Sequence, residues 1–498
     1  MVPYILAIDA GTTSSRAIVF DKDTKKIGLG QFEFSQYFPK NSWVEHDPNE
    51  IWASQQKAIS SALKAAKINS NEVSAIGITN QRETTIVWDR RSGEPIYNAI
   101  VWQDRRTSDY CSSFSEASIN QVAKKTGLIV DAYFSASKIR WILQHVEGAQ
   151  DRAIRGELCF GTVDSWLIHK LTGGSKHITD ASNASRTMLY NIHSGTWDKR
   201  LCDLFNIPIS ILPEVVNSSG YLASTDQEVF GAKIPISGIA GDQQSALFGQ
   251  LCFSSGEAKN TYGTGCFAMT NTGNHIVVSS NKMLSTVAWQ LNGIRTYALE
   301  GSVYVAGSLI QWLRDGLGFF DHSADVEQLA LKEGTSGGIT IVPALTGLGA
   351  PHWDSYARGA IMGITRGTNT SHIAYASLEA IALSTADVLE AMAKDLGQPL
   401  KSIRVDGGAS TNDTLMQIQS DLLNCPVIRP LETESTALGA ALLAGLGIGI
   451  WKSIGELKDL AVIDQKFSPK NGSFASLRNQ WNKGIQSTKG WAEPGNYE

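Results

Sequence analysis

The chain has 498 residues, of which 42% are hydrophobic and 18% are charged. One hydrophobic core rarely serves more than about 300 residues, so this length and composition predict a globular protein of two domains. The net charge of −5, without a long basic run, offers no electrostatic surface for nucleic acid, and we assign no such partner.

The cysteines and the apolar segments favour a cytoplasmic protein. The six cysteines are spread thinly and form no C-x-x-C pair, which is typical of free thiols in a reducing compartment. The N-terminus has no basic segment and its first apolar run stops at Asp9, so a secretory signal is not expected. The longest uncharged apolar stretch, residues 435–451, is short for a membrane span and contains four glycines, so we expect no membrane insertion.

The first predicted elements are two short strands that flank a turn. Residues 4–8 and 17–20 are apolar, and residues 9–16 between them have the sequence DAGTTSSR. Such a turn can aim the Asp9 carboxylate at Mg²⁺ while its backbone N–H groups and hydroxyls meet phosphate oxygens. Considered alone, the turn is equally typical of an ordinary hairpin.

Alternating strands and helices follow in the first half. Residues 27–34 predict a third strand, residues 48–67 a helix capped by Asp47, and residues 73–79 and 84–88 two further strands. In the second half, residues 371–396 predict the clearest helix, with Ser371 as its cap and Gly397 beyond its end.

The opening pattern recurs later in the chain. Residues 259–269 again place a Gly/Thr turn between a polar run and an apolar run. Residues 403–412 predict a strand, a Gly-Gly turn and a helix start, where a backbone without side chains lets a flat ligand approach. By itself this last segment is more typical of a tight connection between a strand and a helix. Two phosphate-type turns in two halves indicate a duplicated domain.

Two longer segments are more specific. Residues 133–145 have the sequence YFSASKIRWILQH, and a second signature extends from GAIMGI at residues 359–364 to ASLE at residues 376–379. With these segments the chain resembles the FGGY family of carbohydrate kinases, a member of the superfamily of actin, sugar kinases and Hsp70 ATPases, from about Tyr4 to Gly449. The segments NQRETT, VWQDRR and GIAGDQQ, at residues 80–85, 101–106 and 238–244, resemble the branch of the family that phosphorylates glycerol.

This resemblance implies an α/β fold with two ribonuclease H-like (actin-like ATPase) domains around an interdomain cleft. Each domain would contain a mixed five-stranded sheet with helices on both faces. The N-terminal domain, residues 1–248, would carry the glycerol site, the Mg²⁺ site and the phosphate turn, and the C-terminal domain, residues 249–498, the nucleotide site. The implied reaction is in-line, ATP-dependent phosphorylation of glycerol to sn-glycerol 3-phosphate, by a cytoplasmic homo-oligomer that is a dimer or tetramer.

The resemblance also implies the site residues. Those implied for the substrate are Arg82, Glu83, Trp102, Tyr133, Asp242, Gln243 and Phe267. Those implied for ATP are Thr12, Thr13, Ser14, Arg16, Thr264, Gly307, Gln311, Gly408 and Asn412. Asp9 and Asp242 would share the Mg²⁺ environment, and Asp242 would be the catalytic base.

Elementary chemistry supports the roles of Arg82, Glu83 and Asp242. A triol has no charge, so a selective site must hydrogen-bond its hydroxyls, and an arginine with a glutamate offers donors and acceptors. Adjacent residues of a strand point to opposite faces, so both reach one ligand only if the chain turns there; alone, the two favour a solvated surface pair. A carboxylate with a pKa of about 4 is too weak to remove an alcohol proton beforehand, so Asp242 would accept it as the bond to phosphorus forms.

Two alternatives stay open from the sequence. One is a related FGGY kinase that acts on a pentulose or a tetritol, from which the Arg82, Glu83 and Trp102 set distinguishes the glycerol hypothesis. The other is a nucleotide-gated binding protein or filament former of the actin type, against which the intact Asp242 argues.

Overall fold

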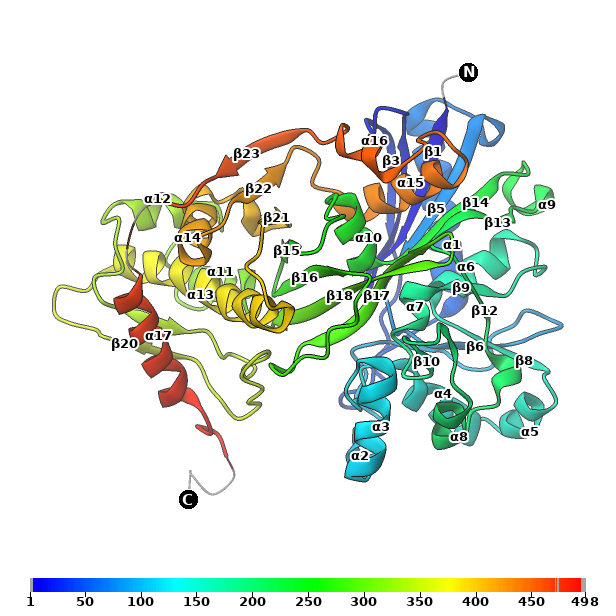
Figure 1. Ribbon diagram of the computed structural model, residues 1–498, viewed down its shortest axis with the longest axis horizontal. Coiled ribbons are helices and arrows are strands. Elements are labelled where there is room, and N and C mark those ends of the chain that lie inside the picture. Colours follow the sequence, from blue (N-terminus) through cyan, green and yellow to red (C-terminus); the bar gives the residue numbers. More distant parts are fainter. Residues whose placement is uncertain (1–2, 471, 473, 494–498) are drawn as a thin grey trace.

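The structure is a computed structural model that describes residues 3–470, 472 and 474–493. The outermost residues of the predicted domains 1–248 and 249–498 lie outside this part. The chain forms two lobes, one made mainly by its first half and the other mainly by its second half (Figure 1). Each lobe is organised around one large sheet.

The first sheet has six strands within the described residues, in the order β13-β14-β5-β1-β2-β3. Strands β1, β5 and β14 are parallel, whereas β2, β3 and β13 are antiparallel to their neighbours. Their bounds are β1 (Tyr4–Ala10), β2 (Ser14–Phe20), β3 (Lys26–Glu33), β5 (Val73–Asn80), β13 (Ser219–Ser224) and β14 (Pro235–Gly241). The predicted strands at residues 4–34 and 73–79 are confirmed.

The second sheet has seven strands within the described residues, in the order β17-β18-β16-β15-β21-β22-β23. Strands β15, β21 and β22 are parallel and the other pairs are antiparallel. Their bounds are β15 (Glu257–Tyr262), β16 (Cys266–Gly273), β17 (Leu284–Leu291), β18 (Ile294–Val303), β21 (Ser402–Asp406), β22 (Val427–Pro430) and β23 (Ile463–Phe467).

The two sheets share one topology, as the repeated turn pattern predicted. Three neighbouring antiparallel strands, β1-β2-β3 or β15-β16-β18, are followed by two parallel strands, β5 and β14 or β21 and β22. The expected five strands describe this shared part correctly, but the count for the whole sheet was wrong. An antiparallel edge strand extends each sheet, β13 in the first and β23 in the second, and β17 pairs with β18 as a further hairpin strand.

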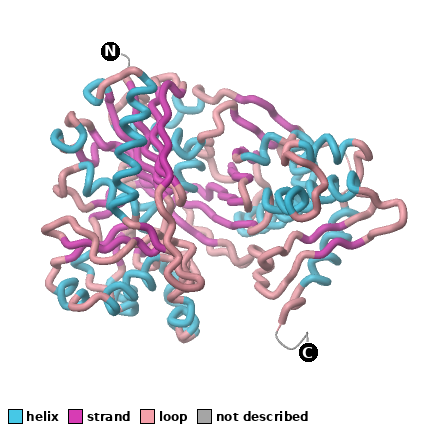
Figure 2. Tube along the Cα trace, turned by 180° about the vertical axis from the view of Figure 1, so that it is seen from behind, coloured by secondary structure: helices cyan, strands magenta, loops and turns pink. Residues whose placement is uncertain are grey.

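Helices cover both sheets. Helix α1 (Pro48–Ala66) packs on β2 and β3, and its N-cap Asp47 accepts a hydrogen bond from the Asn49 backbone N–H, as predicted. Viewed from behind, helices lie over the strands of this lobe (Figure 2). Helix α13 (Thr370–Leu396) packs on the second sheet. Its predicted cap was wrong: Asn369, and not Ser371, caps the helix, because the Asn369 side chain accepts the backbone N–H groups of Ser371 and His372.

Two helices cross between the lobes. Helix α10 (Asp242–Gly249) follows β14 of the first sheet and packs against β15, β16 and β17 of the second. Helix α15 (Ser435–Gly447) comes from the second half of the chain and packs on β1, β5 and β14 of the first sheet. The two helices also pack on each other, and a Cβ atom added to Gly439 would lie 1.8 Å from the Ser245 carbonyl oxygen. One buried apolar cluster therefore includes residues of both sheets, such as Ile5 and Trp289.

The remaining helices and short strands lie outside the two large sheets. The longer helices are α3 (Glu116–Thr126), α4 (Ser135–His145), α6 (Val163–Leu171), α11 (Gly307–Asp315), α14 (Asp413–Leu423) and α17 (Ala475–Thr488). The shorter helices include α2 (Ser108–Ser112), α5 (Ala149–Ile154), α7 (Ala181–Ala184), α8 (Lys199–Phe205), α9 (Gln227–Phe230), α12 (Asp325–Leu331) and α16 (Ile454–Lys458). The short strands include β4 (Glu45–His46), β6 (Ile86–Asp89), β7 (Ala99–Ile100), β8 (Leu158–Gly161), β9 (Ile178–Asp180), β10 (Tyr190–Asn191), β11 (Thr196–Trp197), β12 (Glu214–Val216), β19 (Thr340–Val342) and β20 (Ala360–Met362).

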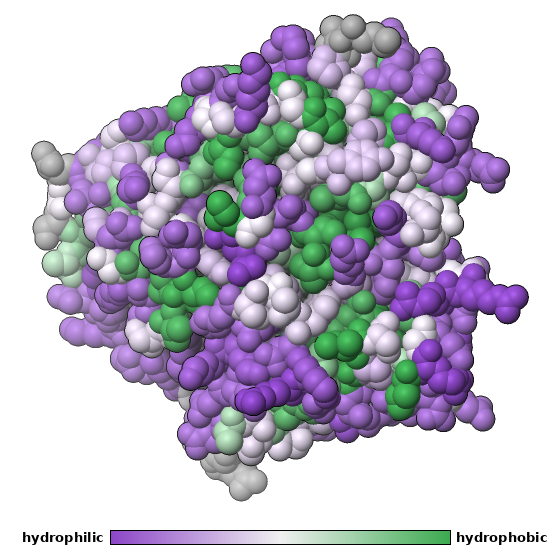
Figure 3. Space-filling view, turned by 45° about the vertical axis from the view of Figure 1, so that its right-hand side comes forward, coloured by the Kyte–Doolittle hydropathy of each residue, from purple (hydrophilic) through white to green (hydrophobic). Residues whose placement is uncertain are grey.

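The described residues contain no helix with the length and apolar character that crossing a membrane requires. On the face shown in Figure 3, hydrophobic residues form separate patches among hydrophilic ones. The six cysteines, all in the described part, are buried free thiols, as the sequence predicted.

Candidate active site

The first turn lies at the end of β1. Asp9 is the next-to-last residue of that strand and is 3% exposed. The Gly11 backbone N–H donates to the Ser14 carbonyl at 3.0 Å and closes the turn. Arg16, on β2, pairs with Asp9 at 2.6 Å and with Glu434 at 2.7 Å. Arg16 is therefore held between carboxylates of the two halves of the chain.

The hydroxyls of this turn have different surroundings. The Trp102 indole N–H donates to Thr12 Oγ1 at 3.0 Å, and the Trp102 ring meets the Tyr133 ring edge to face at 5.6 Å. Thr13 is exposed, and Ser14 Oγ accepts from Gln31 at 3.0 Å. The Trp102 contact joins the phosphate turn to the predicted substrate residues.

The chain turns sharply at Glu83. This residue has a φ of 59°, in the left-handed region, and the Thr84 backbone N–H donates to the Arg82 carbonyl at 2.7 Å. A residue other than glycine seldom adopts this conformation, and it removes the alternation that would separate neighbouring side chains. Arg82 and Glu83 are 3% and 1% exposed, so the alternative of a solvated surface pair was wrong.

A buried cluster of charges surrounds Arg82. Its Nη1 and Nη2 donate to the two carboxylate oxygens of Glu300, the Nη2 bond at 3.1 Å, and its Nε lies 3.1 Å from Asp242 Oδ1. Arg186 donates from Nε to Glu83 Oε1 at 2.6 Å and from Nη2 to Glu300 Oε1 at 2.9 Å. The cluster thus joins two guanidinium groups with three carboxylates.

Asp242 is the first residue of α10, directly after β14, and 32% of its side-chain surface is exposed. The Gln243 backbone N–H donates to Asp242 Oδ1 at 2.7 Å. The Gln243 side-chain oxygen accepts from Lys259, a fully buried lysine of β15 that also donates to Thr261 at 3.0 Å. A helix N-terminus therefore presents the carboxylate beside a strand of the other sheet.

Burial and neighbouring charges shift the pKa values of the carboxylates in opposite directions. Burial raises the pKa of Asp242, and the nearby Arg82 offsets this only in part. The pKa of Glu83 is also raised by burial, against the pull of Arg82 and Arg186. For Glu300, burial is outweighed by Arg186 and Arg82, which lower its pKa to about 2. Glu300 is therefore ionised at neutral pH.

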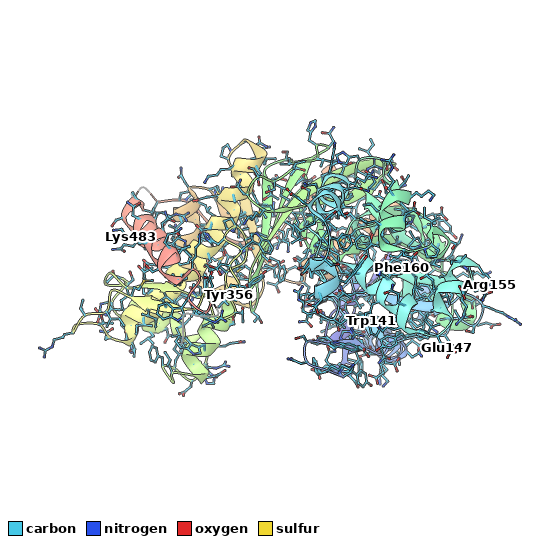
Figure 4. The ribbon with its side chains drawn as sticks, turned by 90° about the horizontal axis from the view of Figure 1, so that it is seen from below. Trp141, Glu147, Arg155, Phe160, Tyr356 and Lys483 are labelled. Carbon is cyan, nitrogen blue, oxygen red and sulfur yellow. The ribbon has the colours of Figure 1, made fainter. Side chains whose placement is uncertain are left out.

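Two cavities meet at Thr264. The first has a volume of about 380 Å³ and the second about 570 Å³, and Thr264 lines both. The first is lined by predicted nucleotide residues, Thr264, Gly307, Gln311, Gly408 and Asn412. The second is lined by three of the seven predicted substrate residues, Trp102, Tyr133 and Phe267, together with Glu300. The other four, Arg82, Glu83, Asp242 and Gln243, are not in its lining. Its walls come from both lobes, which Figure 4 shows from below with Trp141 in one lobe and Tyr356 in the other.

Two glycines line the first cavity in different surroundings: a side chain would clash at one and has space at the other. The Gly307 N–H already donates to the Gly263 carbonyl at 3.0 Å, and a Cβ atom on Gly307 would lie 2.6 Å from that oxygen. Gly307 is therefore required by a close backbone approach. A Cβ atom on Gly408 would meet no described atom within 4 Å, so its face is open. Asn412 caps α14 through its side-chain oxygen, which accepts from the Leu415 N–H at 2.8 Å, and its amide nitrogen has no hydrogen-bond partner among the described residues.

Comparisons with known proteins follow the same division of the chain. Residues 4–249 match the N-terminal domain of the FGGY family of carbohydrate kinases, and residues 258–448 match the C-terminal domain of that family. The chain belongs to the FGGY family of carbohydrate kinases.

Similar proteins cover this FGGY kinase almost completely. The glycerol kinase of Deinococcus radiodurans is 55% identical over 98% of each chain. The glycerol kinase of Parabacteroides distasonis is 55% identical over 98% of this chain and 99% of its own. Among solved structures, Plasmodium falciparum glycerol kinase with ADP superposes with a TM-score of 0.93 at 37% identity, over 98% of each chain.

The sequence located most of the residues that this FGGY kinase brings together, but it missed Glu300, Arg186 and Lys259. Glu300 lies in the run Leu299-Glu300-Gly301 of β18, where a single acid interrupts a buried strand. That interruption was a usable signal. Arg186 gave none, because its partners Glu83 and Glu300 lie 103 and 114 residues away in the sequence. Lys259 stands in the second Gly/Thr turn segment, where no local pattern marks its bond to Gln243.

Proposed function

We propose that this FGGY kinase transfers the terminal phosphoryl group of ATP to a terminal hydroxyl of glycerol and forms sn-glycerol 3-phosphate. The observation that carries the proposal is that Thr264 lines both cavities. A nucleotide in the first cavity and a polyol in the second would meet there. The high identity to glycerol kinases over nearly the whole chain supports glycerol as the polyol.

The charged cluster leaves a donor on Arg82 and an acceptor on Glu83 for a small polyol. Arg82 donates three of its five N–H groups to Gln244 and Glu300, and its Nε lies 3.1 Å from Asp242 Oδ1. The second hydrogen on Nη2 has no partner among the described residues. Glu83 Oε1 accepts from Arg186, and Glu83 Oε2 accepts no hydrogen bond within the described part of the chain. A substrate that lacked a hydroxyl would leave these buried groups unpaired, which is a strong basis for selection.

Asp242 is the proposed catalytic base. Its Oδ1 accepts from the Gln243 N–H and faces Arg82, so that Oδ2 is left to accept a proton from the attacking hydroxyl. Transfer accompanies bond formation to phosphorus, because the carboxylate stays much less basic than an alkoxide.

Asp9 and Asp242 fit a hydrated Mg²⁺. They lie at the ends of β1 and β14, which flank β5, and the register places Ala10, Asn80 and Gly241 side by side. Strands two apart are separated by roughly 10 Å, a span that two carboxylates and retained waters can share around one ion. Each carboxylate has one oxygen bonded, Asp9 Oδ2 to Arg16 and Asp242 Oδ1 to Gln243. When bound, Mg²⁺ would neutralise charge on the phosphate oxygens.

The proposal extends to the other ATP residues and to the cellular setting. Thr12, Thr13, Ser14 and Arg16 would lie beside the terminal phosphates at the end of β1. The free thiols favour the cytoplasm. Assembly into a dimer or tetramer stays a prediction from the family resemblance.

The test is ADP release from Mg-ATP with glycerol, erythritol, xylulose, ribulose or no acceptor. We expect stimulation by glycerol above all others, and turnover that is slower by about two to four orders of magnitude in Asp242→Asn. Asp203→Asn is the matched control, because Asp203 is an exposed carboxylate in a surface pair with Lys199. Stronger stimulation by xylulose, ribulose or erythritol would overturn the assignment of glycerol, and no stimulation by any acceptor would favour a nucleotide-binding protein without kinase activity.

A further inference from the structure

Glu300 belongs to the opposite sheet from the residues that it holds. It lies on β18, in register with Met269 and Leu284, and is 3% exposed. Its carboxylate accepts from Arg82 on both oxygens and from Arg186 on Oε1. Both arginines come from the first half of the chain. A single carboxylate of the second sheet therefore fixes two cations of the first lobe.

Arg186 closes the other side of the same arrangement. Its guanidinium joins Glu83 Oε1 to Glu300 Oε1 and lies 5.2 Å from the centre of the Phe134 ring and 5.8 Å from that of Tyr133. The side chain is fully buried. Because the guanidinium is planar and rigid, contact with two carboxylates and two rings leaves it one orientation.

Arg82, Glu83, Arg186 and Glu300 form a ring of four charged side chains, and their bonds to one another determine which of their atoms can still bind a substrate. Glu300 accepts one hydrogen bond from each terminal nitrogen of Arg82, and Arg186 donates a hydrogen bond to Oε1 of Glu83. The groups that remain include one N–H on Arg82 Nη2 and Oε2 of Glu83, the donor and the acceptor of the proposed polyol site. Arg186 Nη1 also has no hydrogen-bond partner among the described residues. Without Glu300, Arg82 could turn toward Asp242 or Glu83, which its Nε approaches at 3.1 and 3.8 Å.

We propose that Glu300 and Arg186 are positioning residues that determine polyol specificity, by holding Arg82 and Glu83 so that one donor and one acceptor face the substrate hydroxyls. Since Glu300 is contributed by the second sheet, the polyol site is complete only when the two lobes are together. This inference rests on the proposed glycerol kinase activity and adds to it the residues that shape the substrate pocket.

The test compares Glu300→Gln and Arg186→Lys with wild type, using glycerol and 1,2-propanediol, which lacks one terminal hydroxyl. We expect the KM for glycerol to rise about 10- to 100-fold, while kcat falls less than about threefold and the KM for ATP stays within about twofold. The ratio of kcat/KM for glycerol to that for 1,2-propanediol should fall at least about tenfold, because a loosened donor and acceptor no longer reject a substrate with a missing hydroxyl.

Glu379→Gln is the matched control. Glu379 lies on α13 of the same lobe as Glu300, is half-buried and makes no hydrogen bond or ion pair with the described residues of the cluster. Replacing its carboxylate should therefore leave the ratio of kcat/KM for the two substrates at the wild-type value. Arg186→Lys keeps the charge but cannot bridge two carboxylates, so it tests the proposal if Glu300→Gln fails to fold. An unchanged substrate ratio, or a parallel loss of kcat and of affinity for both substrates, would overturn the inference. Failure of the wild type to respond to glycerol would instead overturn the proposed function.

Discussion

A methyl group added to Gly439 should separate the two crossing helices. In Gly439→Ala the new Cβ would lie 1.8 Å from the Ser245 carbonyl oxygen of α10, whereas carbon and oxygen in contact are about 3.2 Å apart. The helices must therefore part by about 1.4 Å at this point. The atom that must move belongs to the backbone, and the Ser245 hydroxyl, which donates to the Thr436 carbonyl at 2.7 Å, resists the shift.

The net effect can be worked out from two opposing terms. Alanine gains about 1 kcal/mol over glycine inside a helix, while overpacking a close contact costs about 1–3 kcal/mol and more when backbone must move. We expect a loss of about 2 kcal/mol in the free energy of unfolding, measured by urea denaturation. Because Ser245 lies one turn after Asp242, kcat should fall as well.

Gly455→Ala is the control for this prediction. Gly455 lies in α16, and its nearest neighbour would be Ser453 Oγ at 3.4 Å, so the helix gain of up to about 1 kcal/mol should appear without a clash. If Gly439→Ala is as stable and as active as wild type, the tight crossing of α10 and α15 is refuted.

Three further predictions concern single side chains. Burial lowers the pKa of Lys138 from 10.5 to about 7, so between these pH values the unfolded chain binds more protons than the folded one. The free energy of unfolding should therefore rise with pH in this range. Lys138→Met should remove up to about 1.4 kcal/mol per pH unit of that slope, measured by urea denaturation at about pH 7, 8 and 9. Trp102→Phe removes the bond to Thr12, and a double-mutant cycle with Thr12→Val should give a coupling of about 0.5–1.5 kcal/mol in kcat/KM for glycerol. Gly408→Val places a side chain in the open face of the first cavity, so the KM for ATP should rise at least about tenfold while that for glycerol stays constant.

Each of the three predictions can be contradicted by one result. A Lys138→Met protein with the wild-type slope would mean that the buried ammonium does not control it. Additive effects of the Trp102 and Thr12 changes would show that the hydrogen bond carries no energy. A Gly408→Val enzyme with unchanged KM for ATP would show that the nucleotide does not bind in the first cavity.

Local sequence determined much of the fold. The Asp47 cap, the apolar runs of β1 and β5 and the Gly/Thr turns act within a few residues, so periodicity and turn chemistry predicted them. The cap of α13 was misplaced by two residues because Asn369 and Ser371 are both good caps, and the choice depends on which side chain reaches the free N–H groups. The edge strands β13 and β23 lie beside neighbours that only tertiary structure selects.

The candidate site was likewise predictable from the sequence only in part. Arg82, Glu83 and Asp242 stand in short segments that a family resemblance identifies. The Arg82 guanidinium is held by Glu300, which lies 218 residues away in the sequence, and no pattern in one sequence joins such positions. The burial that makes the cluster selective is likewise a property of the two packed sheets.

The exchange of helices between the lobes has a consequence for how the protein is made. A chain released after Gly249 would expose the face of its sheet that α15 covers, and the second half alone would lack α10 against β15 and β16. Neither half holds a complete core. During synthesis the first sheet must therefore remain without its last helix until α15 has been made, and the enzyme should unfold as one cooperative unit despite its two lobes.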